Sequence, residues 1–289
     1  MDTRAIIAGL AFALIWSSAF SSARIIVAEA PPMLALSLRF FLSGALGVGI
    51  ALILGQSWRL SREQWGATIV FGLCQNALYL GLNFIAMQTV QASLASIIAS
   101  SLPLLAAVVG GVVYHDRLSP LGIVGLLGGA IGVCLIMGLR LQGGADPMGI
   151  ALCVIGVICL TIATYMVRGA LAGKNLLMIV GLQMWVGALA LLGPGVIFET
   201  WDVVWTPRLT LAFIYTSLFP GLIATVIWFW LVGRIGAVKA ATYHFLNPFF
   251  GVSIAALILG ERMGLLDIVG VVIITLGIWA VQTARKAAR

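Results

Sequence analysis

Long apolar segments separated by short polar loops constrain this chain more than any other feature of its sequence. A helix needs about 20 mostly apolar residues to cross a bilayer. Only 9% of the residues are charged and 62% are hydrophobic, which leaves too few charges to cover the surface of a soluble protein. Because lipid offers the backbone no hydrogen-bond partners, each apolar segment is predicted to be a transmembrane helix. The predicted spans are residues 5–28, 33–55, 65–88, 91–114, 119–140, 147–168, 174–198, 208–232, 238–260 and 264–283.

The second half of the chain repeats a pattern found in the first half, displaced by 145 residues. Residues 86–136 align with residues 231–281 without a gap, and Pro103 falls on Pro248. Each copy contains an apolar helix interrupted by proline, then an acid–base pair, then a second apolar helix. The further matches are Asp116-Arg117 with Glu261-Arg262 and Gly132 with Gly277.

The repeat predicts the topology, because each copy contains five spans. Five is an odd number, so the second copy must enter the membrane upside down relative to the first. We therefore predict an all-α membrane protein with ten transmembrane helices, built as two inverted-topology repeats of five helices. The first repeat is expected over residues 1–143 and the second over residues 144–289. Inverted repeats build many transporters, with the binding site near the midplane between the halves.

Lysine and arginine are distributed unevenly between the loops on the two sides of the predicted bundle. Loops in the cytoplasm carry an excess of these residues, so the richer side is predicted to be cytoplasmic, with both termini there. The same distribution explains the net charge of +7 without a nucleic-acid partner. The richer side holds Arg4, Arg59, Arg62, Arg117, Arg168, Lys174, Arg234, Lys239, Arg285, Lys286 and Arg289. The other side holds Arg140, Arg208 and Arg262.

Polar side chains near the two prolines are candidate substrate-binding residues. Each proline removes a backbone hydrogen bond, and Pro248 is expected to free the carbonyl of His244. Irregular backbone of this kind survives in a membrane where protein or a watery cavity covers it. The proline faces of the two helices include Ser96, Ser100 and His244. The alternatives are that the small residues permit close helix packing, and that His244 packs in the core instead of contacting substrate or carrying a proton.

A second group of candidates lies in the third span and its repeat partner. At 3.6 residues per turn, Asn76, Tyr79 and Asn83 share one stripe with Gly72. Amides and a tyrosine make a poor lipid-facing surface and a good wall for a watery cavity. Trp228 occupies the position that matches Asn83 in the eighth span, although it could also belong to an interfacial belt of aromatic residues.

A third group lies in the first span and its repeat partner. Trp16, Ser17 and Ser21 lie on or beside one stripe of the first span, and Thr161 and Tyr165 occupy the matching stripe of the sixth. These five residues are predicted to contact substrate.

Two arginines also lie within the predicted spans. Arg39 lies about six residues into the second span, and an unpaired arginine near the bilayer centre costs about 2.5–3.5 kcal/mol. Arg39 is therefore predicted to face the cavity or its rim. Arg24 lies only four residues from a helix end, so its side chain is predicted to reach the interface.

Several absences narrow the function. The sequence contains no HExxH, Walker A or nucleophile-elbow motif, and its histidines and cysteines offer no metal cluster, so no catalytic residue, metal or cofactor is predicted. No acidic residue lies in mid-span, which disfavours cationic drugs as substrates. A neutral or zwitterionic solute fits better, because Arg39 can face a carboxylate and aromatic rings can face an ammonium group. Transport is expected to be facilitated diffusion or weakly proton-linked through His244.

The quoted residues resemble a known family of membrane proteins over essentially the whole chain. They are the Trp-Ser-Ser-Ala-Phe run 16–20, Arg39, the block from Pro103 to His115-Asp116-Arg117, and the block from Pro248 to Gly260-Glu261-Arg262. The chain resembles the EamA type of the drug/metabolite transporter superfamily, and within it the YddG-type bacterial exporters of amino acids, aromatic ones included. The first block departs from the family pattern, with His-Asp in place of Gly-Glu. The resemblance implies an exporter of the bacterial inner membrane, with a central cavity, alternating access, and the fifth and tenth helices at the periphery.

The leading prediction is a transporter that exports amino acids or similar small metabolites. The alternatives are an exporter of nucleosides, drugs or other metabolites, a membrane enzyme acting on lipid-linked substrates, and a passive scaffold. The predicted partners are a small-molecule substrate and the lipid bilayer, and the predicted state is a monomer or weak homo-oligomer. Glycines at 125, 128, 129 and 132 form overlapping GxxxG patterns, which are expected to pack helices within the chain.

Overall fold

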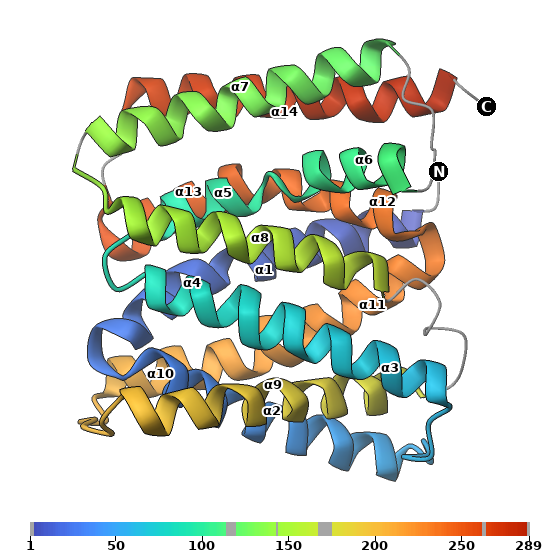
Figure 1. Ribbon diagram of the computed structural model, residues 1–289, viewed down its shortest axis with the longest axis vertical. Helices are drawn as coiled ribbons and strands as arrows, with labels where there is room; N and C mark the ends of the chain where they lie inside the picture. The colour runs from blue at the N-terminus through green and yellow to red at the C-terminus, as the bar shows by residue number, and fades with distance from the viewer. Residues whose placement is uncertain (1–2, 114–119, 143, 167–174, 262–263, 288–289) are drawn as a thin grey trace.

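The computed structural model describes residues 3–113, 120–142, 144–166, 175–261 and 264–287. Every regular element within these ranges is helical, and the helices run side by side across the molecule (Figure 1). In chain order they are α1 (Thr3–Glu29), α2 (Pro32–Ile53), α3 (Arg62–Phe71), η1 (Gly72–Leu80), α4 (Gly81–Ala86), α5 (Ala92–Ala99), α6 (Leu102–Val113), α7 (Pro120–Gln142), α8 (Pro147–Met166), α9 (Leu176–Phe198), α10 (Pro207–Thr216), η3 (Ser217–Ile223), α11 (Ala224–Ile235), α12 (Ala237–Ala241), η4 (Thr242–Leu246), α13 (Asn247–Leu259) and α14 (Leu265–Ala287).

Eight helical segments of the described chain are long and apolar enough to cross a membrane. They agree with eight of the predicted spans to within a few residues. Helices α7 and α14 lie at the positions of the predicted fifth and tenth spans, and their apolar stretches within the described residues are shorter. The eight segments are Thr3–Glu29, Pro32–Ile53, Arg62–Ala86, Ala92–Val112, Pro147–Met166, Leu176–Phe198, Pro207–Ile235 and Lys239–Leu259.

Helices are interrupted at both predicted proline positions. In the first half, α5 ends at Ala99 and α6 begins at Leu102, just before Pro103. In the second half, the 3₁₀ helix η4 separates α12 from α13, which contains Pro248. The prediction that Pro248 leaves the carbonyl of His244 free is wrong. The backbone N–H of Asn247 donates to that carbonyl, because the tighter 3₁₀ turn brings a closer donor to it.

Two π-helical segments, η1 and η3, lie within the helices that precede these interruptions. They begin at Gly72 and Ser217, so their separation, 217 minus 72, equals the 145-residue displacement of the sequence repeat. A π-helix closes its hydrogen bonds from residue i to residue i+5, so its turns are wider than those of an α-helix. Side chains along a π-helix therefore do not stay on a face that is calculated for 3.6 residues per turn.

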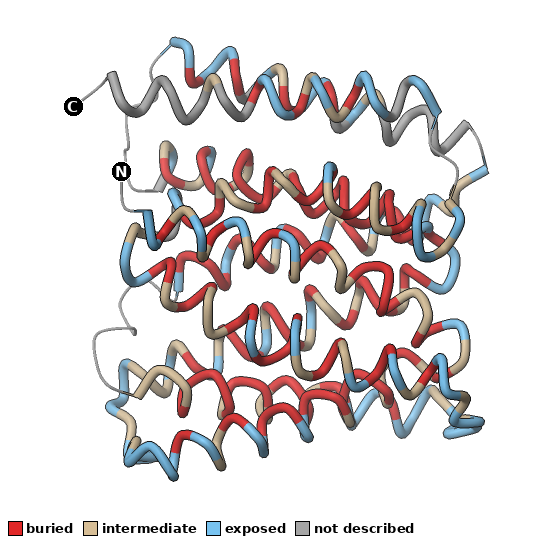
Figure 2. Tube along the Cα trace, turned by 180° about the vertical axis from the view of Figure 1, so that it is seen from behind, coloured by how far each residue is buried: buried red, intermediate tan, exposed pale blue. Residues whose placement is uncertain are grey.

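The first helix of each half packs against helices of the other half. Helix α1 packs against α10, α11 and α13, while α8 packs against η1, α4 and α5. Helix α2 pairs with α9 at one edge of the molecule and α7 pairs with α14 at the other (Figure 1). Buried residues are concentrated on the helices between these edges (Figure 2). Helix α1 begins, and α14 ends, on the same side of the bundle.

Acidic side chains stabilise the starts of helices in the opposite half of the chain. Both carboxylate oxygens of Glu199 accept backbone N–H groups at the start of α2, each at 2.9 Å. Glu261 accepts the first two N–H groups of α5 at 2.9 and 3.1 Å. These N–H groups have no partner within their own helices, and the helix dipole favours a negative charge there.

Asp146 stabilises the start of α8 in a similar way. It accepts hydrogen bonds from the hydroxyl of Thr89 and from two backbone N–H groups of α8. These bonds, chiefly the one from Thr89, hold the pKa of Asp146 below its usual range. Several titratable residues of the sequence prediction lie outside the described residues, namely His115, Asp116, Arg117, Arg168, Lys174, Arg262 and Arg289.

Glycines join α7 to α14, as the GxxxG patterns predict. A Cβ atom at Gly277 would lie 2.5 Å from the carbonyl oxygen of Gly125 and 2.7 Å from the backbone nitrogen of Gly129. A Cβ atom at Gly132 would lie 3.1 Å from the carbonyl oxygen of Gly270. The two backbones therefore approach each other more closely than side chains would permit.

Replacing Gly277 with alanine is expected to destabilise the α7–α14 pair, because the new methyl group collides with backbone atoms that cannot rotate away. Overpacking of this kind typically costs about 1–3 kcal/mol. The apparent melting temperature of the purified protein in detergent should fall. The control is Gly193→Ala on α9, where a Cβ atom has no neighbour within 4 Å. Equal melting temperatures for the two variants would contradict this packing.

Candidate functional site

All thirteen side chains that the sequence predicts as substrate-binding are buried inside the bundle. The most exposed of them, Tyr165, is only 6% accessible. None of them faces the outer surface, as the burial of polar groups away from lipid requires. They are Trp16, Ser17, Ser21, Arg39, Asn76, Tyr79, Asn83, Ser96, Ser100, Thr161, Tyr165, Trp228 and His244.

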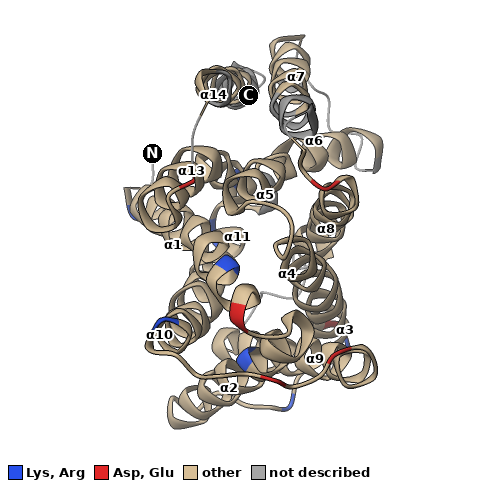
Figure 3. Cartoon of the chain, turned by 90° about the vertical axis from the view of Figure 1, so that its left-hand side faces the viewer, with Lys and Arg blue, Asp and Glu red and all other residues tan. Residues whose placement is uncertain are grey.

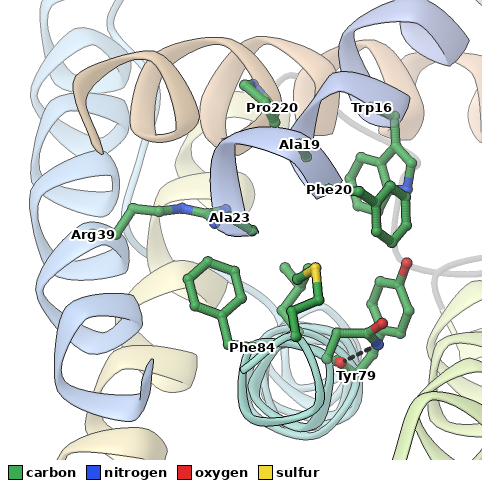
Figure 4. A pocket seen from close by; sticks show the side chains of 11 residues that line it. Trp16, Ala19, Phe20, Ala23, Arg39, Tyr79, Phe84 and Pro220 are labelled. Atoms are coloured by element: carbon green, nitrogen blue, oxygen red, sulfur yellow. Dashed lines mark hydrogen bonds between the residues drawn. The ribbon is translucent and has the colours of Figure 1, made fainter. Parts of the chain in front are cut away.

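Four of the thirteen line one small cavity, which we name the central pocket (Figure 4). They are Trp16, Arg39, Tyr79 and Asn83. The remaining lining residues are Ala19, Phe20, Ala23, Leu80, Phe84, Met87 and Pro220. The lining comes from the first half of the chain apart from Pro220. The cavity volume of about 20 Å³ is enough for roughly one water molecule. The pocket is therefore almost closed in this conformation.

Arg39 extends from α2 into the central pocket, toward Ala23 and above the ring of Phe84 (Figure 4). Its side chain is 3% accessible. The guanidinium carbon lies 4.8 Å from the ring centroid of Phe40 and 5.8 Å from that of Phe84. Such cation–π contacts hold the cation in place without neutralising it.

A cluster of aromatic rings continues from the central pocket toward the other half of the chain. The ring of His244 lies 5.1 Å from those of Phe12 and Trp228 and 5.6 Å from that of Trp16. Trp16 also lies nearly parallel to Tyr79, with 6.4 Å between the ring centroids. Trp16 therefore connects the cluster to the pocket. Trp228 belongs to this buried cluster, so its interpretation as an interfacial residue is wrong.

Asn247 holds the residues around the second proline together. Its side-chain oxygen accepts a hydrogen bond from Ser17 at 3.1 Å, and its side-chain nitrogen lies 3.1 Å from Nδ1 of His244. Its backbone carbonyl accepts a hydrogen bond from Ser96 at 2.8 Å. Three predicted residues from α1, α5 and η4 are therefore brought together by a residue that the prediction did not include.

Asn76 lies outside the lining of the central pocket, although the prediction placed it on one stripe with Tyr79 and Asn83. Its amide donates to both the backbone and side-chain oxygens of Gln183 on α9. The π-helical turn of η1 separates Asn76 from the other two residues. Asn83, in turn, donates to the backbone carbonyl of Tyr79 at 2.8 Å.

Four more predicted residues also lie outside the pocket lining. The hydroxyls of Ser100 and Thr161 donate to carbonyls of their own helices, and that of Tyr165 donates to the carbonyl of Ala106. The buried hydroxyl of Ser21 has no hydrogen-bond partner within the part of the chain that the structure describes. In that part, no group of three His, Cys, Asp or Glu is placed to hold a metal ion.

The sequence prediction missed the apolar half of the pocket. The prediction was based on polar residues within apolar spans, and an aromatic side chain does not stand out in a chain that is mostly hydrophobic. Phe20 lies on the same stripe as Ser17, and Pro220 interrupts an otherwise regular span, so these two had a detectable signal. Phe84 and Met87 had none, because only the packing of α4 against α1 and α2 brings them to the pocket.

A larger cavity of about 520 Å³ lies beside the central pocket, and we name it the end cavity. It is lined by Arg24, Ile25, Ala28, Glu29, Gln91, Arg208, Leu259, Gly260 and Glu261. Figure 3 looks onto this end of the bundle, where α1 ends and α10 begins.

Arg24 lines the end cavity and is bonded to a residue that lines the central pocket. Its guanidinium donates to the carbonyls of Met87 and Gln88, where α4 ends and carbonyls lack helical partners. Ala23 and Met87 line the central pocket on one side of this contact, and Arg24 lines the end cavity on the other. The prediction that Arg24 reaches for the membrane interface did not include this role.

The sequence profile of the EamA-like transporter family matches this chain twice, over residues 3–138 and 147–283. The chain belongs to the EamA-like transporter family. It is thus a multi-pass membrane protein of a transporter family, and the two matches correspond to two copies of the family's repeat.

Relatives align with this EamA-like protein over nearly its full length. It is 27% identical to the uncharacterized transporter YvbV of Bacillus subtilis over 280 residues, covering 96% of this chain and 92% of the relative. It is 26% identical to the uncharacterized inner membrane transporter YedA of Escherichia coli K12 over 288 residues, covering 93% and 90%. A solved crystal structure shares the fold, with a TM-score of 0.75, 21% identity, and coverage of 99% of this chain and 100% of that one.

Replacing Arg24 with alanine is expected to open the route between the two cavities. Hydrogen bonds from a charged donor contribute about 1.5–3 kcal/mol each, so the open population should rise about tenfold or more. The measurement is the maleimide labelling rate of Ala23→Cys in detergent, in a background without the four native cysteines.

Arg208→Ala is the matched control, since Arg208 lines the end cavity but is exposed and makes no hydrogen bond to a described residue. If labelling is equally slow in both variants, Arg24 does not close the pocket.

Proposed function

We propose that this EamA-like transporter exports amino acids, aromatic ones included, or similar small metabolites by alternating access through the central pocket. The observation that supports this most is the combination of one buried cation with aromatic walls in one small cavity. Arg39 would bind a carboxylate, and the faces of Trp16 and Tyr79 would bind the apolar body of the substrate or its ammonium group. Specificity of the YddG type is part of the proposal.

The small volume of the pocket supports a transport cycle with an occluded state. Space for about one water cannot hold an amino acid, so the helices must separate before substrate enters. Both π-helical segments line the pocket, η1 through Tyr79 and η3 through Pro220, and such irregular segments often occur at functional sites. A protein that only crossed the membrane as a scaffold would not require a buried cation there.

The proposal includes ten transmembrane helices in two inverted repeats, residues 1–143 and 144–289. Three features support it. Helices α1 and α8 each pack against the other half, η1 and η3 are separated by the same displacement as the sequence repeat, and α1 begins on the side of the bundle where α14 ends. We further propose that the protein lies in a bacterial inner membrane with cytoplasmic termini, as a monomer or weak homo-oligomer.

The other predicted residues have proposed roles around this pocket. His244 and Trp228 would shape its aromatic wall, and Ser17 and Ser96 would hold that wall through Asn247. The proposed contacts of Ser21, Asn76, Ser100, Thr161 and Tyr165 with substrate require a conformation with a larger cavity.

Purified protein in liposomes is expected to exchange a labelled amino acid for an unlabelled one. Liposomes would be preloaded with each of the common amino acids in turn, and uptake of the labelled compound would be measured against protein-free liposomes. Saturable exchange for at least one amino acid is expected, and competition by nucleosides would separate the alternative substrate class. No saturable exchange for any amino acid would overturn the proposal.

Filling the pocket is expected to abolish this exchange. In Ala19→Phe the benzyl group occupies space that now fits about one water, so exchange should fall to the protein-free background. Ala45→Phe is the control, because Ala45 lies on the exposed surface of α2 and should tolerate the same added volume. Both variants would be checked for monodisperse elution and for melting temperature.

A further inference from the structure

Arg39 is a buried cation with no described anion beside it. Its Nε atom has no hydrogen-bond partner among the described residues, and no described carboxylate forms a salt bridge with its guanidinium. The contacts that remain are the rings of Phe40 and Phe84. Buried charges in proteins are normally paired, because removal from water is costly. The guanidinium therefore needs a partner that the described residues do not supply.

None of the described acidic side chains lies within salt-bridge distance of Arg39. They lie at helix ends or in connections, where Glu199 and Glu261 already bind backbone N–H groups at the starts of α2 and α5. They are Glu29, Glu63, Asp146, Glu199, Asp202 and Glu261. An anionic solute that enters the pocket would supply the partner that these described side chains do not.

The rest of the pocket shows what kind of solute fits. Its walls are the rings of Trp16, Phe20, Tyr79 and Phe84 with aliphatic side chains, Met87 and the amide of Asn83, and no acidic residue lines it. A planar guanidinium binds a carboxylate through two parallel hydrogen bonds, and aromatic walls favour a flat apolar body. No lining group offers an ammonium ion a charged partner.

We propose that the central pocket selects small carboxylates with an aromatic or apolar body, and that the substrate's amino group is dispensable. Arg39 supplies the single charged contact. Amino acids are then one subset of a wider class of organic acids. This inference rests on the proposed function, because it assigns the substrate class of the same pocket.

Four probes with the same phenyl-alkyl body test the inference by calorimetric binding to the purified protein in detergent. Phenylalanine has both charged groups, 3-phenylpropanoate has only the carboxylate, and phenylalaninamide and 2-phenylethylamine have only the amine. The two carboxylates should bind with affinities within about threefold of each other, and the two amines at least about tenfold more weakly. The inference is overturned if the amines bind as tightly as the carboxylates, if 3-phenylpropanoate binds much more weakly than phenylalanine, or if no probe binds.

Variants of Arg39 provide the second measurement. Arg39→Gln should weaken binding of both carboxylates at least about tenfold and leave the amines unchanged, while Arg39→Lys keeps the charge and should retain part of the affinity. Arg208→Gln, at an exposed arginine of the end cavity, should change nothing. Unchanged carboxylate binding in Arg39→Gln would also overturn the inference.

The two proposals fail in different ways. Liposomes that exchange amino acids equally well with the wild type and with Arg39→Gln would overturn the carboxylate inference and leave amino-acid transport standing. Selective binding of 3-phenylpropanoate without any amino-acid exchange would support the carboxylate inference and overturn amino-acid transport.

Discussion

Polar groups in a bilayer must find their partners inside the protein, and this requirement explains several hydrogen bonds that join the two halves. Glu199 and Glu261 of the second half bind the starts of α2 and α5 in the first half. Serines act similarly, since Ser37 donates to a carbonyl of α9 and Ser43 donates to the carbonyl of Ser217. Each bond satisfies a group that lipid would leave unpaired, and each fixes one half against the other.

Seven described residues have a buried polar atom without a hydrogen-bond partner, and Arg39 is the only one of the seven that carries a charge. Asn83 donates to a backbone carbonyl, whereas the guanidinium of Arg39 has cation–π contacts with Phe40 and Phe84 and no salt bridge to a described carboxylate. Glu199 and Glu261 bind the starts of helices, and no described acid lies beside Arg39. Structural arginines in membranes are usually paired, so an unpaired one in a closed pocket is more readily explained by a ligand than by packing.

Some elements of the structure could be predicted from the sequence, and others could not. The spans followed from hydrophobic length, and the interruptions near Pro103 and Pro248 followed from the missing proline N–H. The α7–α14 contact followed from spaced glycines. Asn76 was misplaced because a stripe drawn at 3.6 residues per turn fails across a π-helix, and no residue type in η1 marks that change in advance. Phe84 and Met87 were missed because their role depends on neighbours from α1 and α2.

By itself, the sequence determined that this chain lies in a membrane, that its two halves share one pattern, and which polar side chains would be buried. These properties depend on composition and local spacing, because exposing a polar group to lipid is costly wherever that group lies in the fold. Only the tertiary structure decided which buried residues share a pocket, that Arg24 binds the carbonyl of Met87 beside it, and that Arg39 has no described anion beside it. Those facts depend on contacts between helices far apart in the chain, and no local pattern records them.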